Sequence, residues 1–123
     1  MNVTNLIDLY CEVWSEPDAT RRAQLLASVW APEANYTDPS VNVKGATELL
    51  AHIAKVQAKR PGSKVVRRSK VEHHHNVVRF AWQAIEANGN TLPEGLDLAF
   101  ITDDGWKIER IVGFFGPLKP LTE

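Results

Sequence analysis

Apolar residues in the first half of the chain recur every three or four positions, which is the spacing of an amphipathic helix. The first stripe consists of Val3, Leu6, Ile7, Tyr10, Val13 and Trp14. A second helix is expected to start at Ser15, with a serine cap, a proline in its first turn and Asp18 at the capping-box position, and to end at Pro32. A third stripe follows Gly45, ends before Pro61, and consists of Ala46, Leu49, Leu50, Ile53 and Val56.

From residue 64 onward the hydrophobic period changes from that of a helix to that of a strand. Residues 64–72, 73–86, 96–102 and 106–115 are rich in valine and aromatic residues and predict long strands. Asn88-Gly89 and Asp104-Gly105 are typical of tight turns between strands. Residues 1–123 therefore predict one α+β domain, with three N-terminal helices packed on the concave face of a strongly bent, mainly antiparallel sheet. Such a cone-shaped arrangement leaves a cavity between helices and sheet.

Asp38 is the first candidate for chemistry. Pro39 disfavours a helical conformation at the residue before it, so Asp38 should end a short strand over residues 34–38 and project near the cavity mouth. A carboxylate fixed there suits a general base. It equally suits a plain turn in which Asp38 caps the backbone around Ser40. Both interpretations stay open at this point.

Composition and charge narrow the class of protein. A formal net charge of -1 argues against a nucleic-acid surface, and the basic residues between 64 and 70 fit a solvated strand. The single cysteine, Cys11, excludes an internal disulfide and fits a reducing compartment. No apolar run resembles a signal peptide or is long enough to span a bilayer, so we expect a cytoplasmic protein with no membrane partner.

Several stretches resemble a known family. They are VWAPEANYTDP at residues 29–39, HHNVVRFAW at 74–82, and GLD at 95–97 leading to GFFG at 113–116. Together with the order of elements from residue 6 to 116, they resemble the nuclear transport factor 2-like superfamily and are most similar to its SnoaL-like (polyketide cyclase-like) branch. The resemblance implies the cone-shaped fold and a homodimer formed through the outer sheet face. It does not specify the reaction, because the superfamily includes isomerases, cyclases, dehydratases, epoxide hydrolases and non-catalytic binders.

Ketosteroid isomerases share this scaffold, and the resemblance extends to three of their site positions. Asp38 matches their general base, and Tyr10 matches the tyrosine that donates to the developing oxyanion. Asp97 lies near the position of their second, acidic donor, but about one residue away from it along the strand. A slip of one residue would turn this side chain to the other face of the sheet.

The histidine run at positions 73–75 offers either a metal site or one pocket histidine. His73 and His75 point the same way on a strand, but the sequence places no third ligand beside them, so we expect no metal. His74 shares a face with Val78, Phe80 and Trp82, so it is expected to look inward and act as an acid/base partner of Asp97. The alternative is a partly exposed histidine at the start of a strand.

Large rings are numerous, and a cavity walled by them favours a flat, hydrophobic or aromatic ligand. The expected substrate-binding residues are Trp14, Trp30, Tyr36, Trp82 and Phe115. Arg79 is expected on the opposite face of its strand, paired with Glu109 or another acid across the sheet. The outer face over Val77, Ala81 and Ile85 would then be free for a symmetric dimer.

The leading hypothesis is a SnoaL-like enzyme that needs no cofactor. Asp38 or Asp97 would act as general base on a hydrophobic carbonyl compound, while Tyr10 and His74 supply hydrogen bonds. The reaction would be an isomerisation, an aldol-type cyclisation or a hydration. Two alternatives remain: a non-catalytic ligand-binding or dimerisation domain whose acids are exposed or locked, and an epoxide hydrolase-like site built on Asp97 and Arg79.

Overall fold

The helices lie in the first half of the computed structural model, which describes residues 2–122. They are α1 (Val3–Ser15), α2 (Ala19–Val29) and α3 (Gly45–Lys59). The predicted capping box at Ser15 is wrong, because Ser15 is the last residue of α1 and its hydroxyl accepts a 2.9 Å hydrogen bond from the Val65 amide. Asp18 caps α2 instead, with its carboxylate 2.8 Å from the Arg21 amide. No helix in the described range is both long and apolar enough to cross a membrane.

The strands form one mixed sheet. Two of them lie between the second and third helices in the sequence, and the others follow the third helix. They are β1 (Trp30–Asp38), β2 (Val41–Lys44), β3 (Lys64–Arg67), β4 (Glu72–His74), β5 (Val77–Ile85), β6 (Gly95–Ile101) and β7 (Ile108–Phe114). The strand order is β2-β1-β7-β6-β5-β3, with β4 also pairing with β5. Every pair is antiparallel except β1 and β7, which run parallel.

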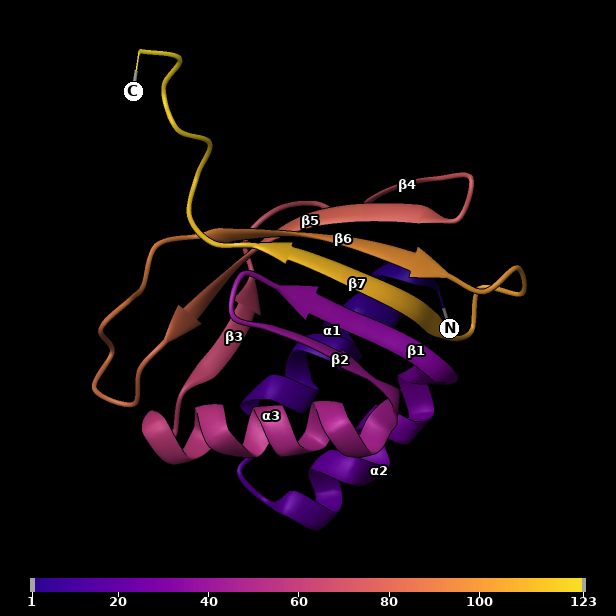
Figure 1. The fold of residues 1–123 in the computed structure, drawn as a ribbon, viewed down its shortest axis with the longest axis horizontal. Coiled ribbons are helices and arrows are strands. Elements are labelled where there is room, and N and C mark those ends of the chain that lie inside the picture. The colour runs from indigo at the N-terminus through magenta and orange to yellow at the C-terminus, as the bar shows by residue number, and fades with distance from the viewer. Residues whose placement is uncertain (1, 123) are drawn as a thin grey trace.

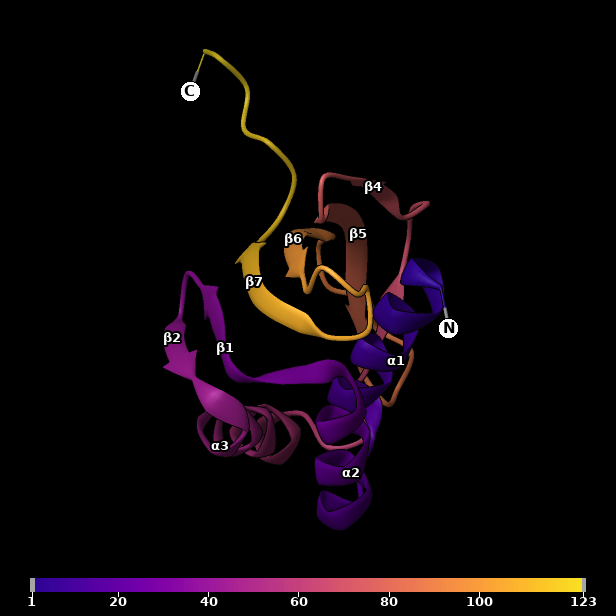
Figure 2. The same cartoon turned by 90° about the vertical axis from the view of Figure 1, so that its right-hand side faces the viewer.

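The sheet is strongly bent, and the three helices cover its concave side (Figures 1 and 2). This confirms the α+β fold predicted from the sequence. Figure 2 shows β1 turning from the helices toward β7, and the register of β1 on β7 shifts between Trp30 and Asn35, around Pro32. A proline cannot donate to a ladder, so an irregularity at this point explains how Pro32 sits inside β1 rather than ending α2.

The core fills the space between the helices and the concave face. Side chains of α1, α2 and α3 meet inward-facing residues of the strands, and all of the following are at most 3% exposed: Leu6, Ile7, Val13, Leu26, Val29, Leu49, Ile53, Val78, Phe80, Ala99, Ile101, Ile108 and Ile111. Most of the helical residues belong to the stripes read from the sequence. This burial is the main favourable contribution to the fold.

The sheet differs from the sequence prediction in several places. Residues 64–72 are not one strand, because β3 ends at Arg67. Residues 73–86 are not one strand, because the chain reverses at His75 and Asn76, whose φ angles are 49° and 62°. The Asn76 carbonyl accepts from the Ile101 amide at 3.0 Å, and the Asn76 side-chain amide donates to Asp103 at 2.7 Å, which stabilises this turn. The short strand β2 was not predicted, and it pairs with β1 from Asp38 opposite Val41 to Asn35 opposite Lys44.

Candidate functional site

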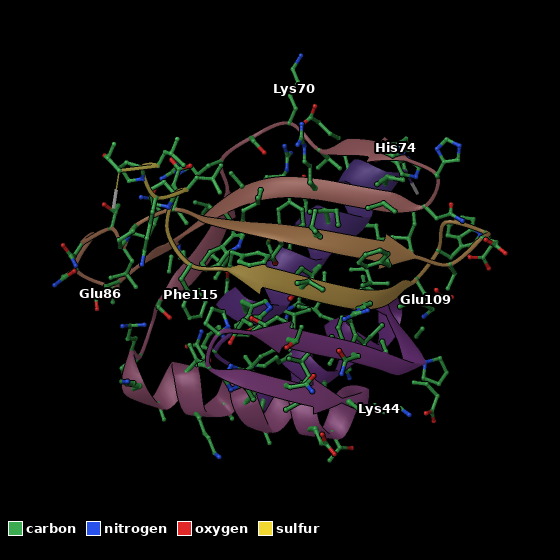
Figure 3. All side chains as sticks on the ribbon, turned by 45° about the horizontal axis from the view of Figure 1, so that its top comes forward. Lys44, Lys70, His74, Glu86, Glu109 and Phe115 are labelled. Atoms are coloured by element: carbon green, nitrogen blue, oxygen red, sulfur yellow. The ribbon has the colours of Figure 1, made fainter. Side chains whose placement is uncertain are left out.

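A cavity of about 900 Å³ opens between α1, α3 and the concave face of the sheet. This volume lies in the range typical of small-molecule sites, which is roughly 300–1,000 Å³. Tyr10 and Trp14 line it from α1, and Phe80 and Trp82 line it from β5. Phe115, just beyond the end of β7, lies on its rim (Figure 3).

Two carboxylates face each other across a glycine on the floor of this cavity. Asp97 pairs with Phe80 on one side and with Gly113 on the other, and Thr37 pairs with Val112, which brings Asp38 beside Gly113. A Cβ atom on Gly113 would lie 2.8 Å from Asp97 Oδ1 and 3.5 Å from the Asp38 Cβ. The register therefore turns Asp97 to the inner face, and the missing side chain of Gly113 leaves room for both acids.

Asp97 is an acid in an apolar environment. The residue is 5% exposed, and its Oδ1 accepts a 2.8 Å hydrogen bond from Trp82 Nε1. Burial raises the pKa of Asp97 to about 7, the Trp82 hydrogen bond opposes this, and the charge of Asp38 adds to it. No side chain or amide in residues 2–122 donates to Asp97 Oδ2, so this oxygen is available to a ligand.

Asp38 also lines the cavity, but both of its oxygens are occupied. Oδ1 accepts from the Ser40 amide and hydroxyl, each at 2.7 Å, and from the Val41 amide at 3.1 Å. Oδ2 accepts from the Tyr36 hydroxyl at 2.5 Å. Asp38 therefore does cap the turn into Ser40, and four hydrogen bonds already hold its carboxylate in place.

Tyr10 lines the cavity, and its hydroxyl is buried without a hydrogen-bond partner among residues 2–122. The residue is 2% exposed. Desolvation raises the pKa of Tyr10 well above its ordinary value, with smaller contributions from Tyr36 and Asp97, so the hydroxyl stays protonated. The indole of Trp14 lies near enough to oppose this shift, but no hydrogen bond between the two side chains is formed. A buried hydroxyl without a partner is unfavourable in the free protein, which means that it can donate to a ligand oxygen at little further cost.

The large aromatic residues fall into two groups: those that line the cavity, and Trp30, which packs in the core. Trp14, Tyr36, Trp82 and Phe115 line the cavity, and the Phe115 ring stands edge-on to Trp82 with centroids 6.3 Å apart. Trp30 does not line it. Its ring stacks on Tyr10 at 6.1 Å, where it supports the tyrosine from within the core.

Comparison with known proteins agrees with this geometry. No protein-family model and no curated protein sequence matches the chain, so the relationship rests on solved structures. A candidate isomerase of the SnoaL-like family from Agrobacterium tumefaciens is 29% identical, covers 93% of this chain and 97% of its own, and superimposes with a TM-score of 0.86. This chain is similar to the SnoaL-like family and has the nuclear transport factor 2-like fold.

More distant structures share the fold of this SnoaL-like protein. A nuclear transport factor 2-like protein from Salmonella enterica is 18% identical, covers 98% of this chain and 93% of its own, and has a TM-score of 0.72. A candidate SnoaL-like polyketide cyclase from a Jannaschia species is 13% identical, covers 90% and 85% of the two chains, and has a TM-score of 0.66. At such identities the likeness extends to the fold alone.

The sequence interpretation of this SnoaL-like protein missed His52. It lines the cavity from α3, with its ring 5.8 Å from Trp14 and 6.0 Å from Tyr36, measured between centroids. Burial lowers the pKa of His52, and the charge of Asp38 opposes this. Its signal was present in the sequence, since it belongs to the stripe formed by Leu49, His52, Ile53 and Val56.

The prediction that His74 faces inward is wrong. The turn at His75 and Asn76 separates it from β5, and the exposed strand β4 carries it outside the cavity, with its Nδ1 3.1 Å from that of His75 (Figure 3). Among residues 2–122, no three histidine, cysteine, aspartate or glutamate side chains lie close enough together to hold a metal ion.

Arg79 also differs from its predicted pairing. It is exposed, and its Nε lies 2.8 Å from Glu72 Oε1 on the neighbouring strand β4 rather than near Glu109. Arg79 follows Val78 and precedes Phe80, both of which are buried, so it faces away from the cavity and from Asp97. The Asp97–Arg79 site considered for epoxide hydrolysis is therefore not formed.

Proposed function

We propose that this SnoaL-like protein is a cofactor-independent enzyme that moves a proton on a carbon next to a carbonyl group, with Asp97 as the general base. The observation that supports it is a buried carboxylate with a pKa of about 7 and one unoccupied oxygen in a cavity of ligand size. General bases work best when their pKa lies near the working pH. The names of the two SnoaL-like structures, one a candidate isomerase and one a candidate cyclase, fit reactions that begin in this way.

In the proposed mechanism, Asp97 Oδ2 removes the proton and the C–H electron pair moves into the bond toward the carbonyl. Negative charge then develops on the carbonyl oxygen, and the Tyr10 hydroxyl donates to it. Returning the proton from Asp97 to a different carbon gives an isomerisation. Attack of the enolate carbon on a second carbonyl gives an aldol-type cyclisation.

Asp38 has a different proposed role. Its four hydrogen bonds hold it as a fixed neighbour of Asp97, and its negative charge contributes to the raised pKa of Asp97. A stronger base removes a carbon-bound proton more readily. We therefore assign proton transfer to Asp97 and electrostatic support to Asp38.

The competing function is a ligand-binding domain without catalysis, and the occupied oxygens of Asp38 favour it. A homodimer through the outer sheet face stays a prediction in either case. Leu96 and Phe114 pair on β6 and β7 and are 36% and 54% exposed, which would suit such a contact.

Kemp elimination of 5-nitrobenzisoxazole tests proton abstraction without knowledge of the substrate. A base takes the ring C–H proton, the N–O bond breaks, and a coloured phenoxide forms. We expect the rate to rise with pH through about 7 and then level off, because only ionised Asp97 can act. Asp97→Asn should lower the rate by roughly 10²–10⁴-fold, the usual contribution of a general base.

The control for this experiment is Glu109→Gln, which removes an exposed carboxylate outside the cavity and should leave the rate unchanged. Asp38→Asn should have a smaller effect than Asp97→Asn. A wild-type protein no faster than the same concentration of acetate would instead favour the ligand-binding function.

Tyr10→Phe separates a functional hydroxyl from a structural one. Removing a buried hydroxyl that has no partner should leave the free energy of unfolding unchanged or raise it by about 1 kcal/mol. The same variant should slow Kemp elimination by roughly tenfold to a hundredfold, because the developing phenoxide loses a donor. Urea unfolding and the rate assay measure the two effects. Lower stability together with an unchanged rate would contradict the assigned role.

A further inference from the structure

One wall of the cavity is basic. Lys55, Lys59 and Arg60, all near the C-terminal end of α3, line it together with His52 and Val56. Positions 52, 55, 56 and 59 follow the helical spacing of three and four, so a single face of α3 carries these groups toward the cavity. The sheet supplies the two carboxylates, Asp38 at the end of β1 and Asp97 on β6.

The two lysines have no anionic partner within the described part of the chain. Neither Lys55 nor Lys59 forms an ion pair, whereas Arg60 Nε lies 3.5 Å from Glu86 Oε2. The acids of the cavity do not neutralise them either. Asp38 is held by Tyr36, Ser40 and Val41, and Asp97 is buried beneath Trp82.

The cavity therefore has an acidic end and a basic end. The His52 ring lies 6.0 Å from Tyr36, which donates to Asp38, so His52 marks the acidic end. Lys59 follows seven residues later on the same helix, a rise of about 10 Å. Trp14, Trp82 and Phe115 line the space between these ends with apolar rings.

We propose that the ligand of this cavity is an anion: a flat, hydrophobic carbonyl compound whose carboxylate or phosphate group is bound by Lys55 and Lys59, away from the carbon that reacts at Asp97. The inference rests on the proposed function, because it takes the acidic end as the reacting end. Attraction to the lysines orients the ligand, and repulsion from Asp38 keeps its anionic group away from Asp97. The carbonyl then meets Tyr10 rather than the basic wall.

The presence of Lys59 at this position has a second explanation, which the experiment must distinguish from ligand binding. It lies in the last turn of α3, where a positive charge interacts favourably with the helix dipole. Lys55 lies one turn earlier and is not explained in this way. Variants of Lys55 alone and of both lysines together therefore distinguish ligand binding from a contribution to the helix.

The experiment compares the binding of 1-naphthylacetate, its neutral amide 1-naphthylacetamide, and 1-naphthyl phosphate, followed by the fluorescence of the cavity tryptophans. We expect the wild-type protein to bind at least one of the two anions on the order of tenfold more tightly than the amide, since exposed ion pairs each contribute a few-fold. The anion that shows the larger preference distinguishes a carboxylate site from a phosphate site. The preference should shrink as salt is added.

Lys55→Gln should reduce the preference and Lys55→Gln with Lys59→Gln should abolish it, whereas Lys55→Arg should retain it. Lys70→Gln is the matched control, because Lys70 is exposed, does not line the cavity, and lies across the molecule from α3 (Figure 3). Equal binding of anions and amide by the wild type overturns the inference, as does binding of none of the probes. A preference that survives in the double variant also overturns it.

The same proteins separate this inference from the proposed function. Asp97→Asn should lose Kemp elimination and keep the anion preference. An anion preference without Kemp elimination in the wild type would end the proposed mechanism and leave an anion-binding cavity. Kemp elimination without an anion preference would end the inference alone.

Discussion

Asp97→Asn is expected to make the protein more stable at about pH 8 while removing its proton-transfer activity. In the wild type, ionised Asp97 must be held in a site that is 5% exposed, which is unfavourable. Asparagine is neutral and has nearly the same shape, and its side-chain oxygen can still accept from Trp82 Nε1. If the Asp97 carboxylate were needed for structure alone, Asp97→Asn would instead make the protein less stable.

The stability gained by Asp97→Asn is expected to increase as the pH rises. The pKa of Asp97 is about 7 in the folded protein, against an ordinary value of 3.8. Between these two values the folded chain keeps a proton that the unfolded chain has released, so the contribution of Asp97 to stability is lost as pH rises from about 4 to 7. The full loss is roughly 4 kcal/mol, at about 1.4 kcal/mol for each unit of pKa.

Urea unfolding of the wild type and Asp97→Asn, measured between about pH 4 and pH 8, checks this prediction. The difference in the free energy of unfolding should be near zero at the acid end and reach a few kcal/mol at the alkaline end. Glu109→Gln serves as the control for losing an exposed carboxylate. A difference that does not change with pH, or an Asp97→Asn protein that is less stable at pH 8, would contradict a buried, desolvated acid.

Gly95→Ala is expected to destabilise the protein by about 3 kcal/mol, at the upper end of the usual cost of overpacking. A Cβ atom at this position would lie 2.3 Å and 2.4 Å from two atoms of the Trp82 ring and 2.8 Å from the backbone oxygen of Phe114. The Trp82 ring would have to move, and Trp82 Nε1 would leave Asp97. Because this hydrogen bond lowers the pKa of Asp97, its loss should raise that pKa and shift the midpoint of the Kemp profile to higher pH.

Gly105→Ala is the matched control for this substitution. Nothing lies within 4 Å of the added Cβ at Gly105, but its φ of +76° is unfavourable for alanine, at a cost of about 1 kcal/mol. Urea unfolding followed by tryptophan fluorescence separates the two variants. Equal destabilisation would mean that the close approach of Gly95 to Trp82 is not important for the fold.

The helices could be predicted well because each one buries a single stripe. Leu49 and Ile53 are fully buried on α3, as the apolar spacing indicates. The turn at His75 and Asn76 was missed because no glycine or proline marks it and the residues on both sides alternate like one strand. The parallel pairing of β1 with β7 leaves no local pattern, since it depends on residues far apart in the chain.

The candidate site was predicted less completely than the fold. Asp38, Asp97 and Tyr10 could be singled out through a family resemblance, and all three line the cavity. Which acid has a free oxygen could not be predicted, because it depends on the hydroxyl of Tyr36 and the indole of Trp82. Lys55 and Lys59 were missed because charged residues on a helix usually indicate a solvated face, and only the folded structure shows that both line the cavity.

The parallel pairing of β1 with β7 also determines when the cavity can exist during synthesis. Thr37 pairs with Val112, so the strand that carries Asp38 must wait for a distant segment before its partner β7 emerges from the ribosome. Contacts between such distant segments slow folding, because the intervening chain must first close a long loop. A nascent chain that ends before Ile108 would contain α1, α3 and Asp97 but lack Gly113 between the two acids. We therefore expect the two acids to come together only after β7 has been added, which makes assembly of the site a late step in folding.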